Sequence, residues 1–96
     1  MDHSQTEQRR LDILRHLDAL PQFASNALII GDVLRGRGIA TTEDQLRAAL
    51  AWLEEQELVR LRHGDEVTIV EIRGRGSEVA RGAAVHPGVA RPRPAR

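Results

Sequence analysis

The 96-residue chain has no cysteine and no lysine, and its only aromatic residues are one phenylalanine and one tryptophan. The absence of cysteine excludes disulfides and thiolate metal sites. Two aromatics are too few for base stacking along a single-stranded nucleic acid. No apolar run approaches the roughly 18 residues of a membrane span, so we expect no membrane partner. The polar N-terminus does not resemble a signal peptide, which favours a cytoplasmic location.

Catalytic patterns are also missing. The four histidines, at positions 3, 16, 63 and 86, do not have metal-ligand spacing to one another or to a carboxylate pair. Gly36 and Gly38 do not follow a strand and form no complete dinucleotide fingerprint. No nucleophile has an evident base. We therefore expect a protein that is not an enzyme and that needs no cofactor or metal.

The charges of the chain balance overall but are unevenly placed. Residues 1–57 carry six arginines and ten acidic residues, a net charge of −4, whereas residues 58–96 carry eight arginines and four acidic residues, a net charge of +4. A molecule with this separation can dock a polyanion through its basic end, or dock its own copy head to tail.

The length of the chain suits one small domain. We expect a frayed N-terminus over residues 1–5, a folded domain over residues 6–82, and a disordered tail over residues 83–96. The tail is rich in proline and arginine and has no periodicity. It is interpreted either as a non-specific electrostatic arm or as a solubilising end.

Residues 41–72 organise the domain. Thr42 and Gln45 have capping-box spacing at the start of a helix over residues 42–56, and an apolar stripe follows at Leu46, Ala49, Leu50 and Leu53. After this helix, residues 58–62 and 67–72 predict two strands joined by a turn at Gly64-Asp65.

A two-residue loop at Gly64-Asp65 predicts the register of this hairpin. It places Leu61 opposite Thr68 and Val59 opposite Val70. One face then holds Val59, Leu61, Val70 and Ile72 with Thr68, and should cover the helix. The other face holds Leu58, Arg60 and Arg62 opposite Glu71, Ile69 and Val67, and should meet solvent or a partner.

The first 40 residues supply the remaining cover. A helix should begin near Thr6, with Ser4 and Glu7 as its cap, and end before Pro21. Leu11 lies off its main apolar face, which indicates either a wide stripe or a dimer contact. Phe23 is interpreted as a plug of the core.

A second helix should be capped by Ser25 or Asn26 and end at residues 36–38. Its predicted apolar residues are Leu28, Ile29, Val33 and Leu34. Within it, Gly31 suggests a close helix crossing. Ile39-Ala40 is predicted to be a third short strand, and residues 78–81 a short helix that ends at Gly82.

These elements give an α+β fold, mainly α with a small β-hairpin. The expected order is helix, helix, short strand, helix, strand, strand and short helix. Leu46, Leu50, the run from Trp52 to Gln56 and Leu58-Val59 resemble the junction of helix and wing in winged helix-turn-helix proteins. Within that fold, residues 52–56 and the tail at 86–94 resemble small proteins of Mu-like phages and prophages that are described as similar to ArsR-type regulators. The usual pattern has glycine at position 57, so Glu57 must either adopt a left-handed conformation or end the helix another way.

The resemblance implies a homodimeric transcriptional regulator, of phage or prophage origin, that binds double-stranded DNA in the bacterial cytoplasm. The helix over residues 42–56 would enter the major groove, and the wing at 58–72 would lie on the backbone. The candidate DNA-binding residues are Thr41, Thr42, Gln45 and Arg47 for the groove, and Arg60, Arg62, Arg73 and Arg75 for phosphates.

Each of these assignments has an alternative. Asp44 and Glu55 on the exposed helix face oppose phosphates, so this face is interpreted either as a groove reader or as a solvated surface. Arg60 and Arg62 either contact phosphates or pair with Glu71 and Glu66. We expect Arg73 and Arg75, in a glycine-rich exit, to be flexible and unpaired.

The alternative function is a winged-helix protein interaction module that does not bind DNA. Its partner would dock on the acidic helix face or on Trp52. For Trp52, packing against the first helix or the hairpin is the other interpretation.

Overall fold

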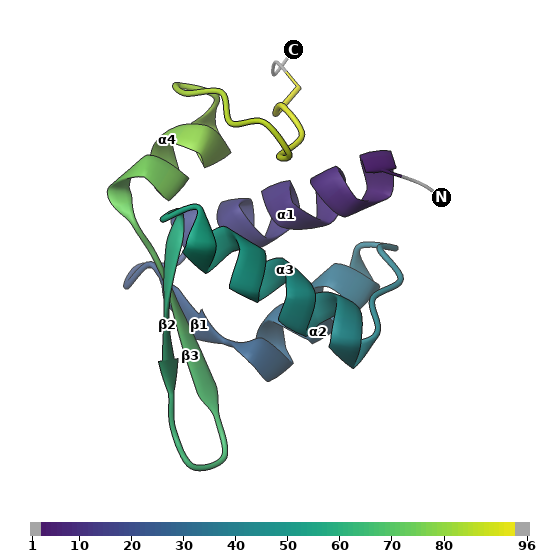
Figure 1. Cartoon of the computed structure of the whole chain (residues 1–96), viewed down its shortest axis with the longest axis vertical. Coiled ribbons are helices and arrows are strands. Elements are labelled where there is room, and N and C mark those ends of the chain that lie inside the picture. The colour runs from purple at the N-terminus through teal and green to yellow at the C-terminus, as the bar shows by residue number, and fades with distance from the viewer. Residues whose placement is uncertain (1–2, 94–96) are drawn as a thin grey trace.

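The structure, a computed structural model, describes residues 3–93 and has an α+β fold (Figure 1). Four helices accompany a three-stranded antiparallel sheet of order β1-β3-β2. The elements are α1 (His3–Asp18), β1 (Ala24–Asn26), α2 (Ala27–Gly36), α3 (Glu43–Glu55), β2 (Val59–His63), β3 (Thr68–Ile72) and α4 (Gly74–Arg81). The predicted α+β class is therefore confirmed, while the predicted element order is wrong at the first strand.

The third strand precedes α2 instead of following it. Ala24 lies opposite Glu71 in β3, and Asn26 lies opposite Ile69. The prediction of a strand at Ile39-Ala40 is wrong because the Ile39 backbone N–H donates to the Leu34 carbonyl, at 2.9 Å. Ile39 therefore closes the end of α2 and is buried beside it.

The hairpin is confirmed, but its register differs from the prediction by two residues. Val59 lies opposite Ile72, and Leu61 lies opposite Val70. The loop has four residues, 64–67, closed by the Gly64 N–H donating to the Val67 carbonyl at 2.8 Å. Neither Gly64 nor Asp65 has the positive φ that a two-residue loop favours. A slip of two residues keeps every side chain on its predicted face, with the exception of Leu58.

Leu58 is fully buried and not on the solvent face. It precedes β2, and its N–H donates to the Leu53 carbonyl at 3.0 Å. Glu57 has a φ of +63°, so the helix ends through the left-handed conformation, one of the two predicted routes. For a residue with a Cβ, this conformation costs about 1 kcal/mol.

The start of α3 forms the predicted capping box. The Gln45 N–H donates to Thr42 Oγ1 at 3.0 Å, and the Thr42 N–H donates to Gln45 Oε1 at 2.9 Å. The predicted stripe of α3 is buried throughout. Close crossing at Gly31 is also confirmed, because a Cβ there would lie 3.3 Å from Leu46 Cδ2.

The first two helices differ from the prediction in detail. Helix α1 begins at His3, so residues 3–5 belong to it and are not frayed. Leu11 is buried in the core, which confirms the wide stripe. Asn26 caps α2, because its Oδ1 accepts from the Ile29 N–H at 2.9 Å. The buried residues of α2 are Ile30, Gly31 and Leu34, whereas Leu28 and Ile29, two of the apolar residues noted in this helix, are exposed.

Phe23 is not a core plug. Its side chain is 43% exposed and its φ is +58°. The Phe23 carbonyl accepts from the Ile72 N–H at 2.9 Å, so the backbone of Phe23 joins the end of the sheet. Because its conformation is left-handed, its side chain does not follow the alternation of side chains in β1.

The chain after β3 forms a longer helix than predicted. Helix α4 begins at Gly74 and ends, as predicted, at Gly82, which has a φ of +80°. Arg73 is the N-cap residue of α4 and Arg75 lies in its first turn. The expectation that these two arginines lie in a flexible exit is therefore wrong.

Residues 83–93, here called the C-terminal strap, fold back onto α1 and α3 rather than forming a disordered tail (Figure 1). Arg10 Nη1 donates to the Gly88 carbonyl at 2.9 Å, and the Ala90 N–H donates to the Glu7 carbonyl at 3.2 Å. Val89 is buried. The strap has no helix or strand, and a short irregular segment of this kind gives no periodic signal in sequence. The predictions for residues 1–2 of the N-terminus and residues 94–96 of the tail fall outside the described residues.

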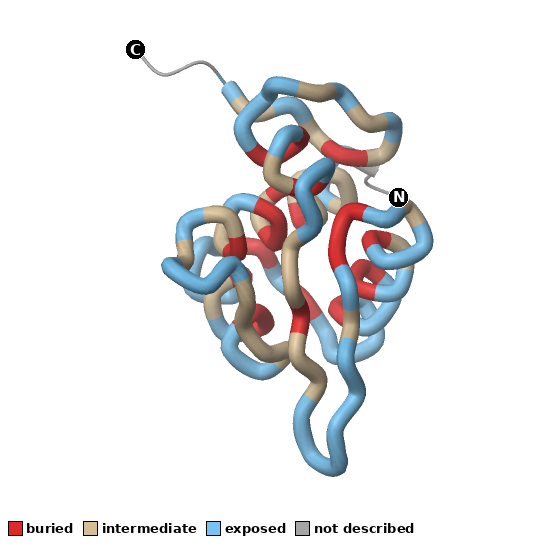
Figure 2. Tube along the Cα trace, turned by 90° about the vertical axis from the view of Figure 1, so that its left-hand side faces the viewer, coloured by how far each residue is buried: buried red, intermediate tan, exposed pale blue. Residues whose placement is uncertain are grey.

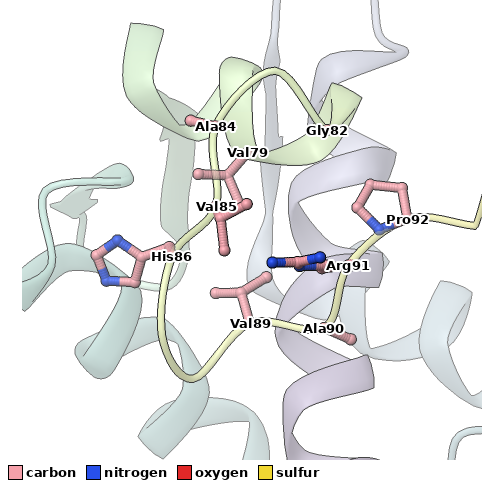
Figure 3. A pocket seen from close by; sticks show the side chains of 9 residues that line it. All are labelled: Val79, Gly82, Ala84, Val85, His86, Val89, Ala90, Arg91 and Pro92. Atoms are coloured by element: carbon pink, nitrogen blue, oxygen red, sulfur yellow. The ribbon is translucent and has the colours of Figure 1, made fainter.

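Trp52 is the anchor for the strap. The Arg10 guanidinium lies 3.9 Å from the centroid of the Trp52 ring, and the His86 ring meets the same indole edge-on at 5.7 Å. This confirms that Trp52 packs against the first helix. Around the strap, Val79, Val85 and Val89 gather beside a small cavity of about 170 Å³ (Figure 3).

His86 makes stability depend on pH. Its Nε2 lies 2.9 Å from Gln56 Oε1, and its Nδ1 has no partner among the described residues. Burial lowers the pKa of the His86 imidazole, and the positive charge of Arg75 lowers it further. Burial likewise lowers the pKa of His16, with a smaller contribution from Arg37.

We therefore expect the free energy of unfolding to fall as the pH drops below about 6.5. The unfolded chain then binds protons at both histidines, while the folded chain resists protonation. Urea unfolding at pH 7.5 and pH 5.5 measures this, and His86→Gln should reduce the loss. The control is His63→Gln at the exposed hairpin tip. Equal losses in the wild-type protein and His86→Gln would contradict this role of His86.

Candidate nucleic-acid interface

The exposed face of α3 contains three of the predicted groove readers. Thr42 and Gln45 are exposed, although each uses a side-chain oxygen in the capping box. The Arg47 side chain is 74% exposed, and its Nη1 lies 3.3 Å from Asp44 Oδ1. As the sequence suggested, Asp44 and Glu55 are exposed on the same helix. Helix α3 therefore offers polar groups of both charges.

Thr41 has an internal role. It is buried, its hydroxyl donates to the Ile39 carbonyl at 2.9 Å, and it accepts from Arg9 Nε at 3.1 Å. Arg9 also donates to the Ala40 carbonyl at 3.0 Å, and Arg35 Nη1 donates to the Thr41 carbonyl at 3.0 Å. Thr41 thus fixes the connection between α2 and α3 and is not placed to contact a base.

Sequence reasoning did not identify Arg9 and Arg35 as the residues that hold this connection. Arg9 is buried, and it precedes Ile13 by four residues on the inward face of α1. That spacing is the available signal, because residues four apart share a helix face.

The hairpin directs its arginines away from the core. In β2, Val59 is buried and Leu61 partly buried, whereas Arg60 and Arg62 are exposed on the opposite face. Arg62 Nη2 lies 3.5 Å from Glu71 Oε2, so the predicted cross-strand pairing holds for Arg62. Within residues 3–93, Arg60 makes no ion pair. The hairpin tip, exposed on both strands in Figure 2, carries Asp65 and Glu66.

Arg60 and Arg73 belong to one surface, here called the outer patch. Together with Phe23 they line a shallow depression whose other lining residues are Gln22, Glu71, Ile72 and Gly74. Arg73 is exposed and has no ion pair in the described part of the chain. Arg75 lies apart from this depression, where its charge acts on His86.

A second surface, here called the α3 groove, lies on the other side of β2. This groove of about 520 Å³ is lined by Ala27, Leu28, Arg35, Glu43, Leu46, Arg47, Leu50, Ala51, Glu54, Leu61, His63 and Thr68. Helices α2 and α3 form one wall and the inward face of the hairpin forms the other. Glu54 Oε2 spans the two, accepting from the Leu61 N–H at 2.9 Å. Sequence reasoning missed this groove because the position of Leu28 on its helix does not show whether another element covers its side chain.

The eight predicted residues therefore do not form one continuous surface. Arg47 lines the α3 groove, Arg60 and Arg73 line the outer patch, and Thr41 is internal. Successive residues of a strand point to opposite faces, which separates Arg60 from the groove residue Leu61.

Residues 3–93 contain neither a cluster of metal ligands nor a membrane-spanning helix. They contain no group of three histidine, aspartate or glutamate side chains that could hold a metal ion. None of the helices in this range has the length and apolar character required to cross a bilayer.

Comparison with known proteins finds a relative that matches nearly the whole chain. An uncharacterized protein, gp26 of Escherichia phage Mu, is 40% identical to this chain over 89 residues, which cover 93% of this chain and 92% of gp26. No protein-family model and no solved structure matches the chain.

Proposed function

Since this chain belongs to the family of the phage Mu protein gp26, we propose a function suited to a small phage protein: it binds double-stranded DNA as a winged-helix transcriptional regulator. It would act in the cytoplasm of the bacterial host, as a homodimer. The alternative, an interaction module without DNA binding, is favoured by one observation, the apolar α3 groove with glutamates at its rim.

The arrangement of the second half of the chain supports the winged-helix proposal. Helices α2 and α3 follow one another across a six-residue connection and cross closely at Gly31. The β2-β3 hairpin comes directly after α3 and projects beyond the helices as a wing (Figure 1). In this proposal α3 enters the major groove, with Gln45 and Arg47 nearest the bases and Thr42 at the helix N-terminus beside a phosphate.

The observation that most directly supports the proposal of DNA binding is that Arg60 and Arg73 lie together in the outer patch. Two exposed arginines without ion pairs in the described part of the chain come together there from different elements. Arg62 follows on the same hairpin face, where it pairs with Glu71, and Arg75 carries a separate positive charge on α4 near His86. Asp44, Glu55, Asp65 and Glu66 oppose phosphates, so we expect modest affinity with little contribution from base contacts.

Salt dependence tests this proposal. If four arginines contact phosphates, the logarithm of the binding constant for a random duplex should fall against the logarithm of salt concentration with a slope of about −3 to −4. Fluorescence anisotropy between about 50 and 200 mM salt measures this slope. Arg60→Ala/Arg62→Ala/Arg73→Ala/Arg75→Ala should weaken binding and bring the slope near zero.

The matched control removes the same charge elsewhere. Arg15→Ala/Arg37→Ala/Arg91→Ala/Arg93→Ala changes four exposed arginines outside the proposed interface. We expect this variant to retain most of the wild-type slope. No binding by the wild-type protein at low salt would contradict DNA binding, and equal slopes for the two quadruple variants would contradict the site assignment.

A further inference from the structure

The α3 groove exposes apolar side chains that the fold itself does not cover. Leu28 is 72% exposed at the start of α2, and Ala51 is exposed on α3. Leu50 and Leu61 extend this apolar surface to the base of the groove. An uncovered apolar surface with a charged rim is typical of an interaction site.

The groove lining contains two arginines and two glutamates, and only the arginines have ion-pair partners within residues 3–93. Arg35 Nη2 lies 2.9 Å from Asp32, and Arg47 lies 3.3 Å from Asp44, so both arginines have carboxylate partners. Glu43 and Glu54 have no ion pairs within residues 3–93. Glu54 accepts a hydrogen bond from the Leu61 N–H, but this neutral donor does not compensate the negative charge of the Glu54 carboxylate. A ligand for this groove should therefore combine an apolar group with flanking positive charges.

The outer patch has that combination. Phe23 is the largest exposed hydrophobic side chain in the described part of the chain, and it lies in the same depression as Arg60 and Arg73. Glu71 in this depression is already paired with Arg62. A bulky residue with positive φ is also a backbone outlier, of the kind that persists at functional surfaces.

We propose that copies of this chain associate head to tail, with Phe23 of one copy inserted in the α3 groove of the next. Arg60 and Arg73 then approach Glu43 and Glu54 of the neighbouring copy. Aromatic residues and arginine are the side chains most enriched at the centres of protein interfaces. The contact uses Arg60 and Arg73, which the DNA-binding proposal assigns to phosphates, so association between copies and DNA binding compete for the outer patch. The α3 groove is the part of the contact that DNA binding leaves unexplained. The proposal does not depend on DNA binding, and it replaces a closed two-fold dimer by a head-to-tail contact.

The placement of the two surfaces determines the type of assembly. They lie on opposite faces of the hairpin, so a copy cannot satisfy its own groove with its own Phe23. The contact is heterologous, because different surfaces of the two copies meet. Heterologous contacts generate rings if the rotation closes and open chains if it does not.

Two variants separate the two halves of this contact. Phe23→Asn removes the aromatic side chain at a position where asparagine tolerates the left-handed conformation. Leu28→Ser removes the exposed leucine of the groove. Ile29→Ser is the matched control, because Ile29 is 49% exposed on the same helix but lines a different depression, with Leu20 and Ile69. Circular dichroism verifies that each variant is folded.

Sedimentation velocity over a range of protein concentrations measures the assembly. We expect the mass of the wild-type protein to rise beyond that of a dimer with concentration, and high salt to reduce this rise. Phe23→Asn alone and Leu28→Ser alone should remain monomeric. An equimolar mixture of the two should form a dimer and stop there, because each variant keeps one intact surface. Ile29→Ser should assemble like the wild-type protein.

Several results would overturn the proposal. The proposal is wrong if the wild-type protein stays monomeric at all concentrations. It is also wrong if Phe23→Asn and Leu28→Ser do not form a dimer in the mixture. A wild-type dimer that both variants retain would place the interface elsewhere. A monomeric protein that binds a synthetic Leu/Arg amphipathic helix through Leu28 would assign the groove to another protein.

Discussion

Gly76→Ala is expected to destabilise the fold by about 3 kcal/mol or more. Gly76 is buried in the first turns of α4, where a Cβ would overlap the Leu58 carbonyl oxygen and lie 2.8 Å from Ile72 Cγ1. The backbone cannot shift easily, because the Leu58 carbonyl also accepts from the Arg73 N–H at 2.9 Å. Displacing either group breaks the contact that joins the end of β3 to the start of β2.

Urea unfolding of matched glycine variants measures this effect. Gly74 lies in the same helix, and a Cβ there would meet nothing within 4 Å. Gly74→Ala should therefore be neutral or stabilise the protein by up to about 1 kcal/mol, through a better helix propensity and a less flexible unfolded chain. Similar stabilities for Gly76→Ala and Gly74→Ala would show that the start of α4 does not contact the Leu58 carbonyl as described.

Gly88→Ala is expected to release the C-terminal strap and to destabilise the protein by about 2 kcal/mol. Gly88 has a φ of +93°, and a Cβ there would lie 2.7 Å from Trp52 Cζ2 and 3.2 Å from Arg10 Nη1. Both the backbone conformation and the contact with the indole therefore favour glycine. The substitution cannot be accommodated without moving the strap away from α3.

The fluorescence of Trp52 reports this release directly, because the chain has one tryptophan. Detachment of His86 and Gly88 exposes the indole to water, so the emission of folded Gly88→Ala should shift to longer wavelength. Ala83→Ser, at an exposed strap position, is the control and should leave the spectrum unchanged. An unshifted spectrum for Gly88→Ala would mean that the strap tolerates the added methyl group without detaching.

Features with local causes were predictable from the sequence. The capping box at Thr42 and the stripe of α3 depend on residues within a few positions of one another, and both are confirmed. The faces of the hairpin were also correct, since a register error of two residues preserves them.

Features with distant causes were not predictable in this way. The strand β1 exists because its three residues lie beside β3, about 45 positions later in the chain. The strap is held by Arg10 and Trp52, which are far from it in sequence. Phe23 was assigned to the core from its residue type, whereas its conformation directs it outward.

The candidate site shows the same division. The sequence identified the exposed arginines but did not show which of them share a surface. That grouping depends on which side of the hairpin the helices cover. Arg47 and Arg60 consequently lie on separate surfaces. The α3 groove is formed because Leu28 of α2 and Leu61 of β2, far apart in sequence, line the same depression. No local sequence pattern predicts that they come together.

The bond between Glu54 and the Leu61 N–H has a consequence for how copies of the chain can grow into larger species. Strand β2 is the last strand on its side of the sheet, and its unpaired backbone groups would otherwise form a template for an incoming strand. The Glu54 carboxylate occupies one of these donors with a charged group from the adjacent helix. Lateral extension of the sheet is therefore obstructed at the middle of β2, which on this edge favours contacts between copies through side chains over strand pairing.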